Sequence, residues 1–225
     1  VEQAETRELI EPEAIVPFAI TQDQALKTEL DWFRKEGLRL RAKPAPPSGI
    51  YLPAWTFDLG GELTWSYMVY EHKQRVTKTG SWVVFENDVI VPASHNLSAT
   101  LADEISKCPL DGIKPYDPGF LADWLAETYE ISVSDASLVA RSRVFEKEKH
   151  EINKGIFGQI MEMKVSSANL VVNSFKLILL PMWVTYYQME GSKRWIVING
   201  WDGNLRAEEP HNGVGGWLSS LLGER

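Results

Sequence analysis

The sequence predicts an α+β protein in which antiparallel β meanders are braced by helices. Stretches rich in aromatic and β-branched residues cover residues 50–93 and 158–205. Helical patterns with capping signals precede and separate these stretches, and turn formers divide each stretch into shorter apolar runs. The resulting order of strand, helix, meander, helices and meander is typical of helices packed on one face of an antiparallel sheet.

The first helix has the clearest signals at both of its ends. Residues 1–13 form a charged lead-in, and the apolar run 14–20 predicts a short buried strand. Thr21 and Gln24 have the spacing of a capping box, and Gly37 supplies a stop. The apolar residues that we expect on the buried face of this helix are Leu26, Leu30 and Phe33.

The first meander follows a proline-rich break at residues 41–49. Its three predicted strands cover residues 50–59, 62–72 and 80–93. We expect turns at the glycine pair 60–61 and at the Glu-Asn-Asp sequence 86–88, because these residues favour turns.

The middle of the chain predicts three helices. Ser98 is placed to cap a short helix that carries Leu101 and Ile105, and Asp117 with Pro118 starts a second one. The inward residues of this second helix are expected to be Leu121, Trp124 and Leu125. A longer helix over residues 134–152 begins at Ser134, and its charged run "EKEKHE" predicts a solvated face. The apolar residues assigned to this longer helix are Leu138, Phe145 and Ile152.

The last third of the chain is predicted as strands over residues 158–172, 175–188 and 193–205. The sequences "MEGSKRW" and "NGWDGN" predict turns, since Asn-Gly and Asp-Gly tolerate positive φ. We therefore expect a single domain over residues 14–210, with halves at 14–97 and 98–210, and a glycine-rich tail at 211–225.

The sequence "YLPAWTFD" at 51–58 is loosely repeated as "LLPMWVTY" at 179–186. Proline gives no N–H to a sheet ladder, so each motif indicates a strand edge or bulge, and together they predict a pseudo-repeat of two β units. Trp55 and Trp183 can be interpreted in two ways. In the first, they form an aromatic platform for a sugar, base or peptide, together with Tyr51, Tyr186 and Tyr187. In the second, their indoles are buried in the core. We favour the core, because large aromatic residues in strands are ordinary core constituents.

Composition excludes several classes of function. The chain has 225 residues and a formal net charge of -8, so nucleic acids and anionic membranes meet a repulsive field. The single Cys108 excludes an internal disulfide framework and a cysteine-rich zinc site. No apolar run is long enough for a transmembrane helix, and the acidic N-terminal residues are unlike a signal peptide, so we expect a soluble, cytoplasmic protein.

Motifs for catalysis and cofactors are sparse. The sequence has no phosphate-binding glycine loop, and its four histidines lack metal-ligand spacing, so we expect neither a cofactor nor a metal. Ser94 and His95 are adjacent on an extended segment and would point to opposite faces, and Cys108 has no nearby base. The carboxylates of Asp58 and Glu127 are the candidates for acid–base chemistry, which leaves a hydrolase with a cleft between the halves as an alternative function.

The favoured function is a non-enzymatic binding or scaffolding module that acts through protein–protein contacts, with a protein partner or a second copy of the chain. The tail places four apolar residues at helical spacing, suited to docking on its own domain or on a partner. Contact with a membrane surface is disfavoured, because Arg225 is the only cation of the tail. The candidate partner-binding residues are Trp55, Trp183, Tyr186, Trp217, Leu218, Leu221 and Leu222.

The phrases "VPFAIT", "GIYLPAWTFD", "DVIVPASHNLS", "YDPGFLADWLAETYEI" and "LLPMWVTYYQMEGSKRWIVINGWDGNLRAEEP" resemble a family of poorly characterised bacterial and archaeal zinc-ribbon-containing proteins. Some members of that family carry primosomal or helicase labels. The last phrase also resembles PepSY-like modules. The resemblance implies a mixed α and β architecture. The zinc-binding cysteine pairs of the family would lie before Val1 and no helicase motif is present, so neither zinc nor replication is carried over to this chain.

Overall fold

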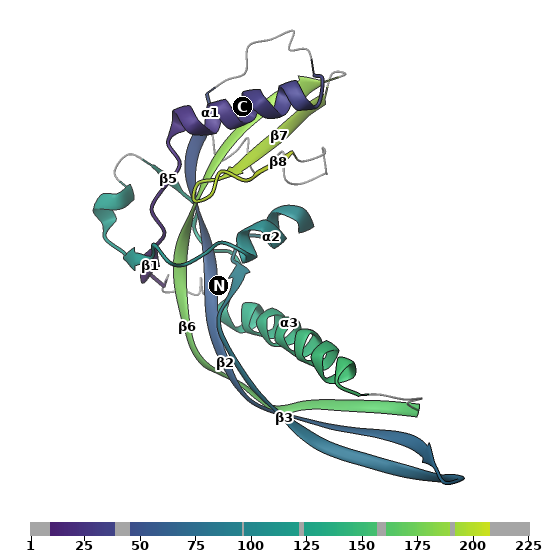
Figure 1. Cartoon of the computed structure of the whole chain (residues 1–225). Coiled ribbons are helices and arrows are strands. Elements are labelled where there is room, and N and C mark those ends of the chain that lie inside the picture. Colours follow the sequence, from purple (N-terminus) through teal and green to yellow (C-terminus); the bar gives the residue numbers. More distant parts are fainter. Residues whose placement is uncertain are drawn as a thin grey trace, which may run out of the picture. The chain divides into compact units, whose positions relative to one another are not determined.

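The computed structural model describes residues 10–38, 46–95, 97–121, 124–156, 161–189 and 192–207 (Figure 1). Within these ranges the chain has the expected α+β fold, with eight strands and three α-helices. The helices are α1 (Gln22–Lys35), α2 (Ala99–Ser106) and α3 (Val133–Lys154), with a 3₁₀ helix η1 (Pro118–Leu121). The strands are β1 (Ala14–Ile15), β2 (Ser48–Glu71), β3 (Gln74–Pro92), β4 (Lys114–Pro115), β5 (Leu125–Ala126), β6 (Met161–Met189), β7 (Ser192–Asn199) and β8 (Leu205–Ala207).

The chain forms two compact units, and neither is continuous in sequence. Unit 1 comprises residues 1–54, 92–130 and 176–225, and unit 2 comprises residues 55–91 and 131–175. Each of the expected halves, 14–97 and 98–210, therefore contributes to both units. The long strands β2 and β6 each pass from one unit into the other.

The sheet is mostly antiparallel. Its hydrogen-bonded path is β3-β2-β6-β1-β4, and β5, β7 and β8 pair outside that path. Strands β6, β7 and β8 form an antiparallel meander in the last third of the chain, with Trp183 opposite Ile198. Its strands are divided differently from the prediction, because β6 covers the first two expected strands and the third is split into β7 and β8. The expected "NGWDGN" turn joins β7 to β8 and places Gly203 at a φ of 76°. Two short strands are parallel to long ones, because β1 pairs with β6 and β5 pairs with β2.

The first meander differs from the prediction, because it is a two-stranded hairpin. β2 continues through Gly60 and Gly61, and the chain turns at His72 and Lys73, whose φ angles are 49° and 66°. Gly61 does not form a turn. A Cβ atom at this position would collide with the carbonyl oxygen of Asn169 on β6. The glycine therefore allows two strands to approach closely.

The other predicted interruptions are also absorbed into long strands. Asp88 has a positive φ of 55° but lies inside β3, which is typical of a bulge. β6 runs without a break through Asn173 and Ser174, where we expected one strand to end and another to begin.

Helix α1 has the predicted ends but a different buried face. Thr21 and Gln24 form the expected capping box, and Gly37 follows with a φ of 66°. The buried residues are Ala25, Glu29 and Phe33, whereas Leu26 and Leu30 are half-buried. The helix is thus rotated from the predicted orientation, and it carries a carboxylate in the middle of its buried stripe.

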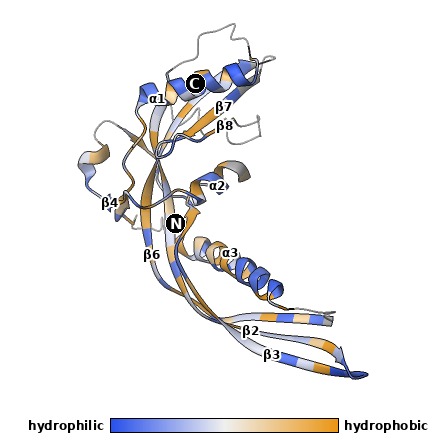
Figure 2. Ribbon diagram, in the orientation of Figure 1, coloured by the Kyte–Doolittle hydropathy of each residue, from blue (hydrophilic) through white to orange (hydrophobic). Residues whose placement is uncertain are grey.

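Helix α2 is as predicted, and α3 starts one residue before its predicted range. Ser98 accepts a hydrogen bond from the Leu101 backbone N–H at the start of α2. The N-cap of α3 is Ser132, and Leu138 is 63% exposed because the small residues of the helix face inward. The buried residues of α3 are Ala136, Ala140, Val144, Glu148 and Ile152. The later turns of α3 are hydrophilic, as expected for the charged run (Figure 2).

The predicted helix after Asp117 ends after one turn. Asp117 accepts a hydrogen bond from the Gly119 backbone N–H at 2.7 Å, which starts η1 as expected. Leu125 then pairs with Ile50 in a parallel arrangement and is 48% exposed. Strand pairing therefore overrides the helical pattern in this segment.

The two Pro-x-Trp segments use the same anchoring device. The Trp55 indole N–H donates to the carbonyl of Ile131, and the Trp183 indole N–H donates to the carbonyl of Ile20, each at 2.9 Å. Both acceptors directly precede a helix N-cap, Ser132 in unit 2 and Thr21 in unit 1. In each unit a tryptophan on a long strand thus anchors the beginning of a helix, and that helix belongs to the other half of the sequence.

Candidate binding site

The candidate site lies in a cluster of aromatic side chains in unit 1. Phe18 and Trp124 stack with ring centroids 4.4 Å apart, and Trp183 approaches Phe18 at 4.7 Å and Trp124 at 5.5 Å. Tyr51 belongs to the same cluster and lies edge-on to Phe18 at 5.2 Å. These four residues come from the segment after β1, from β2, from the segment before β5 and from β6, so only the folded unit brings them together.

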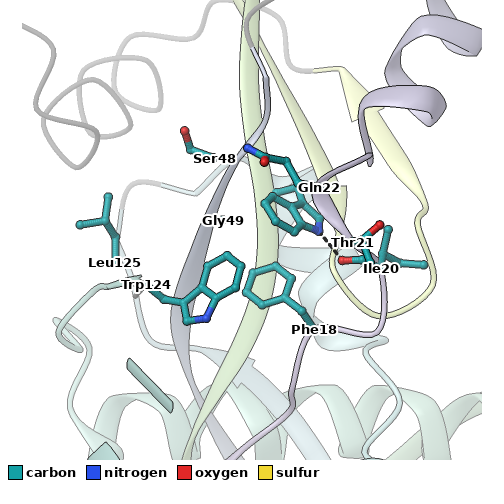
Figure 3. Close-up of a pocket in the computed structure, with 9 residues that line it drawn as sticks. Phe18, Ile20, Thr21, Gln22, Ser48, Gly49, Trp124 and Leu125 are labelled. Carbon is teal, nitrogen blue, oxygen red and sulfur yellow. Dashed lines mark hydrogen bonds between the residues drawn. The ribbon is translucent and has the colours of Figure 1, made fainter. Parts of the chain in front are cut away.

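A pocket of about 580 Å³ opens against these rings (Figure 3). The rings of Phe18 and Trp124 face one another in Figure 3, with Leu125 to the left and with Ser48 and Gln22 above the rings. None of the lining residues has an ionisable side chain. The lining residues are Phe18, Ile20, Thr21, Gln22, Ser48, Gly49, Trp124, Leu125 and Trp183.

Two glycines allow the rings to take these positions. A Cβ atom on Gly49 would collide with the ring of Trp124 and would lie 3.1 Å from Cζ3 of Trp183. A Cβ atom on Gly200 would lie 2.7 Å from Cδ1 of Phe18. The pocket walls therefore depend on bare backbone at both positions.

Two of the polar side chains at the rim, those of Thr21 and Gln22, are already engaged. Thr21 accepts a hydrogen bond from the Gln24 backbone N–H as part of the α1 capping box. The amide of Gln22 donates to the carbonyl of Pro47 at 2.9 Å. The rim is thus held in place by internal hydrogen bonds, and the aromatic rings provide the main surface for a ligand.

A strand edge borders the pocket. β5 pairs with β2 and with no other strand among the residues that the structure describes. Leu125 on β5 lines the pocket and is 48% exposed. An extended chain laid beside β5 would therefore pass the mouth of the pocket.

A buried carboxylate lies on the helix that borders the pocket. Glu29 is fully buried between Ala25 and Phe33 on α1, and neither of its carboxylate oxygens has a hydrogen-bond partner. Burial raises the pKa of Glu29 to about 7. The Nε of Arg194 is also buried without a partner, on the same face of β7 as Ile196, which packs in the cluster of Ala25 and Phe33.

The predicted partner-binding residues lie in different places. Both tryptophans are buried, Trp55 in unit 2 and Trp183 in unit 1, and Trp183 also contributes to the pocket lining. Tyr186 is half-buried and packs edge-on against Trp195 at 5.4 Å. It lies three residues after Trp183 and therefore on the opposite face of β6. The tail residues Trp217, Leu218, Leu221 and Leu222 lie outside the described residues.

The two candidate carboxylates hold backbone and side-chain groups in place. Asp58, in unit 2, accepts hydrogen bonds from the Asp88 backbone N–H and from the Ser174 hydroxyl. Glu127, in unit 1, accepts a hydrogen bond from the Ser94 hydroxyl at 2.6 Å. Each hydrogen-bond set accounts for the position of its carboxylate, and the two residues belong to different units.

The other residues considered for chemistry have structural surroundings. The backbone N–H of His95 donates to Glu130, while Ser94 bonds to Glu127. Cys108 is buried, and burial, with a smaller contribution from the charge of Asp202, raises the pKa of its thiol to about 12. Across the described ranges, no group of histidine, cysteine and acidic side chains is arranged to hold a metal ion.

Of the residues that line the pocket, sequence reasoning singled out only Trp183 as a candidate for binding. Phe18 was assigned to a strand, Trp124 to the interior of a helix and Gly49 to a loop, and the structure brings all three into the pocket. An available signal was the glycine directly before the aromatic strand at residue 50, because a glycine in such a position often marks a close approach of another group.

The comparisons with known proteins place the chain beside an uncharacterised relative. It is 23% identical to the uncharacterized protein YdjG of Bacillus subtilis (strain 168) over 235 residues, which cover 94% of this chain and 68% of YdjG. No family model matches the sequence, and no solved structure matches it. None of the described helices is long and apolar enough to cross a membrane.

Proposed function

We propose that this chain is a non-enzymatic binding module that holds an apolar side chain of a protein partner in the aromatic pocket of unit 1. The observation that carries the proposal is the pocket lining, in which Phe18, Trp124 and Trp183 supply aromatic surface and no residue supplies an ionisable group. Concave, mostly apolar sites with a few polar groups at the rim are typical of ligand binding.

Catalysis is disfavoured by the same lining. General acid–base or nucleophilic chemistry requires a titratable group or an activated nucleophile within hydrogen-bond reach of the substrate. The lining hydroxyls are those of Thr21, which serves as a helix cap, and Ser48, which has no acid or base beside it in the lining.

A polypeptide fits the surroundings better than a free small molecule. The edge of β5 offers backbone hydrogen bonds next to the pocket, so an extended segment can pair there while one of its side chains enters between the rings. Aromatic and large aliphatic side chains gain most from such a site, because stacked or edge-on ring pairs contribute about 0.5–1.5 kcal/mol beyond area burial.

The test is selection of a random displayed peptide library on the full chain. We expect the enriched peptides to share one aromatic or large aliphatic anchor. Ser48→Trp places an indole at the exposed rim without removing a core contact, and it should weaken binding at least about tenfold. Ser166→Trp, at an exposed strand position in unit 2, is the matched control and should leave binding unchanged. Enriched peptides that bind the Ser48→Trp chain equally well, or a selection that enriches nothing, would contradict the proposal.

A further inference from the structure

The strand β3 forms an open edge of the sheet in unit 2. It spans 19 residues and, within the described part of the chain, hydrogen-bonds to β2 and to no other strand. Its C-terminal end is not suited to further pairing, since Asp88 has a positive φ and Pro92 lacks an N–H. The stretch from Gln74 to Asn87 is therefore free to accept another strand along its outer side.

The middle of this edge strand is unusually apolar for an exposed position. Val83 is 78% exposed and Phe85 is 73% exposed, whereas Val84 between them is buried. Trp82 donates to Glu148 of α3, and Glu86 forms an ion pair with Lys147 of α3. Because side chains alternate along a strand, Val83 and Phe85 point to the face away from α3.

The charges along β3 are divided between its two ends. Arg75 and Lys78 lie in the first part of the strand, and Glu86 and Asp88 lie in the last part. Two copies of the strand aligned antiparallel would bring the basic end of each beside the acidic end of the other. A parallel alignment would instead place like charges together, which is destabilising.

We propose that β3 pairs antiparallel with β3 of a second copy of this chain and continues the sheet across a two-fold axis. The antiparallel arrangement brings Val83 of one copy close to Phe85 of the other, and aromatic–β-branched pairs across strands are favourable. The strand is self-complementary in charge, as a two-fold interface requires. The inference does not depend on the pocket in unit 1.

The decisive experiment exchanges the charges in the full chain. One variant carries Arg75→Glu with Lys78→Glu, and the other carries Glu86→Lys with Asp88→Lys. In each variant both ends of β3 carry the same sign of charge, so two copies of one variant repel each other at these ends. We expect its dimer to be at least about tenfold weaker than that of the unchanged chain in sedimentation equilibrium. Mixed in equal amounts, the two variants should form a heterodimer, because every basic end then meets an acidic one.

The matched control exchanges an exposed ion pair of α3, Glu151→Lys with Lys154→Glu, and should leave the dimer unchanged. Phe85→Lys should weaken the dimer without unfolding the chain, since the side chain is mostly exposed. Three results would overturn the proposal: an unchanged chain that remains monomeric at about 100 μM, a dimer that is indifferent to the charge variants, or variants that fail to form the heterodimer on mixing.

Discussion

In both units of this protein a tryptophan side chain holds the start of a helix, but only in unit 1 does that tryptophan also line a pocket. In unit 2, Trp55 is fully buried, bonds to the carbonyl before α3 and has Phe175 at 6.1 Å. In unit 1, Trp183 makes the equivalent bond to the carbonyl before α1 and is also buried, but it contributes to the lining of a pocket. The tryptophan is therefore a structural element in both units, and the neighbours that surround it decide whether a binding surface results.

The neighbours that make the difference are contributed by other segments of unit 1. Phe18 and Trp124 add two rings around Trp183, and Gly49 leaves the space for one of them. A repeated motif can thus predict a repeated way of fixing a helix, while the binding site depends on residues outside the motif.

Each unit also has a helix with a buried carboxylate, and the two carboxylates differ in their hydrogen bonding. Glu148 of α3 accepts the Trp82 indole N–H at 2.6 Å, whereas the oxygens of Glu29 of α1 have no hydrogen-bond partner. A satisfied buried acceptor is nearly neutral or favourable, but an unsatisfied one costs stability. The same substitution in the two helices should therefore have opposite effects.

Removal of the two anchoring tryptophans should give the largest effects. Trp55→Ala leaves a closed cavity and should lower the free energy of unfolding by about 3–5 kcal/mol. Trp183→Ala should cost less than Trp55→Ala, about 3 kcal/mol, because the space left joins the pocket and the penalty for a closed cavity is smaller. Urea unfolding of the full chain measures both values. An equal or larger loss for Trp183→Ala would mean that the two environments do not differ as described.

Neutralising Glu29 should stabilise the protein at high pH. The folded-state pKa of about 7 lies above the ordinary value of 4.5, so the unfolded chain loses this proton first, and stability falls as pH rises from about 4.5 to 7. Glu29→Gln should raise the free energy of unfolding by about 2–3 kcal/mol at pH 8 and change it little at pH 4.5. Urea unfolding at both pH values tests this, and a gain of the same size at both would argue against burial of the charge as its cause.

The equivalent change in α3 should destabilise. Glu148→Gln replaces a charged acceptor by a neutral one for the Trp82 N–H, and we expect a loss of about 1 kcal/mol at pH 8. Measuring Glu29→Gln and Glu148→Gln under identical conditions shows directly whether the changes in the free energy of unfolding have opposite signs. A stabilising Glu148→Gln would show that this carboxylate, too, is poorly satisfied.

The smallest effect on stability should come from Gly49→Ala. The added Cβ collides with the half-buried ring of Trp124, which must shift, so the free energy of unfolding should fall by about 1 kcal/mol, the lower end of overpacking costs. Affinity for a selected peptide should fall more clearly, because the pocket wall moves. Gly155→Ala is the control, since its Cβ would meet its nearest atom at 3.5 Å and its φ is -75°. Equal peptide affinity for both variants would place the ligand elsewhere.

The local signals of the sequence were the most reliable guides to the fold. The capping residues Thr21 and Ser98 and the turn at "NGWDGN" depend on interactions within a few residues, and the structure confirms them. The α+β class follows from the same patterns and is also confirmed.

The non-local features could not be read in the same way. Gly60 and Gly61 suggest a turn, yet β2 runs on because pairing with distant β6 makes a bare backbone useful there. The hydrophobic pattern predicts Leu26 and Leu30 on the buried face of α1, yet Glu29 is buried there instead. Trp124 was expected in a helix, and it reaches the pocket because the helix stops after one turn so that β5 can pair with β2.

The most direct test of the binding site is an NMR titration of the full chain with indole-¹⁵N-labelled tryptophan. The ligand is a peptide selected from the library, and single Trp→Phe variants assign the signals. We predict that the Trp124 and Trp183 indole signals shift on addition of the peptide, while those of Trp55 and Trp82 in unit 2 stay in place. Shifts confined to Trp55 and Trp82, or no shift at Trp124 and Trp183 when the peptide is bound, would contradict a binding site in the aromatic pocket of unit 1.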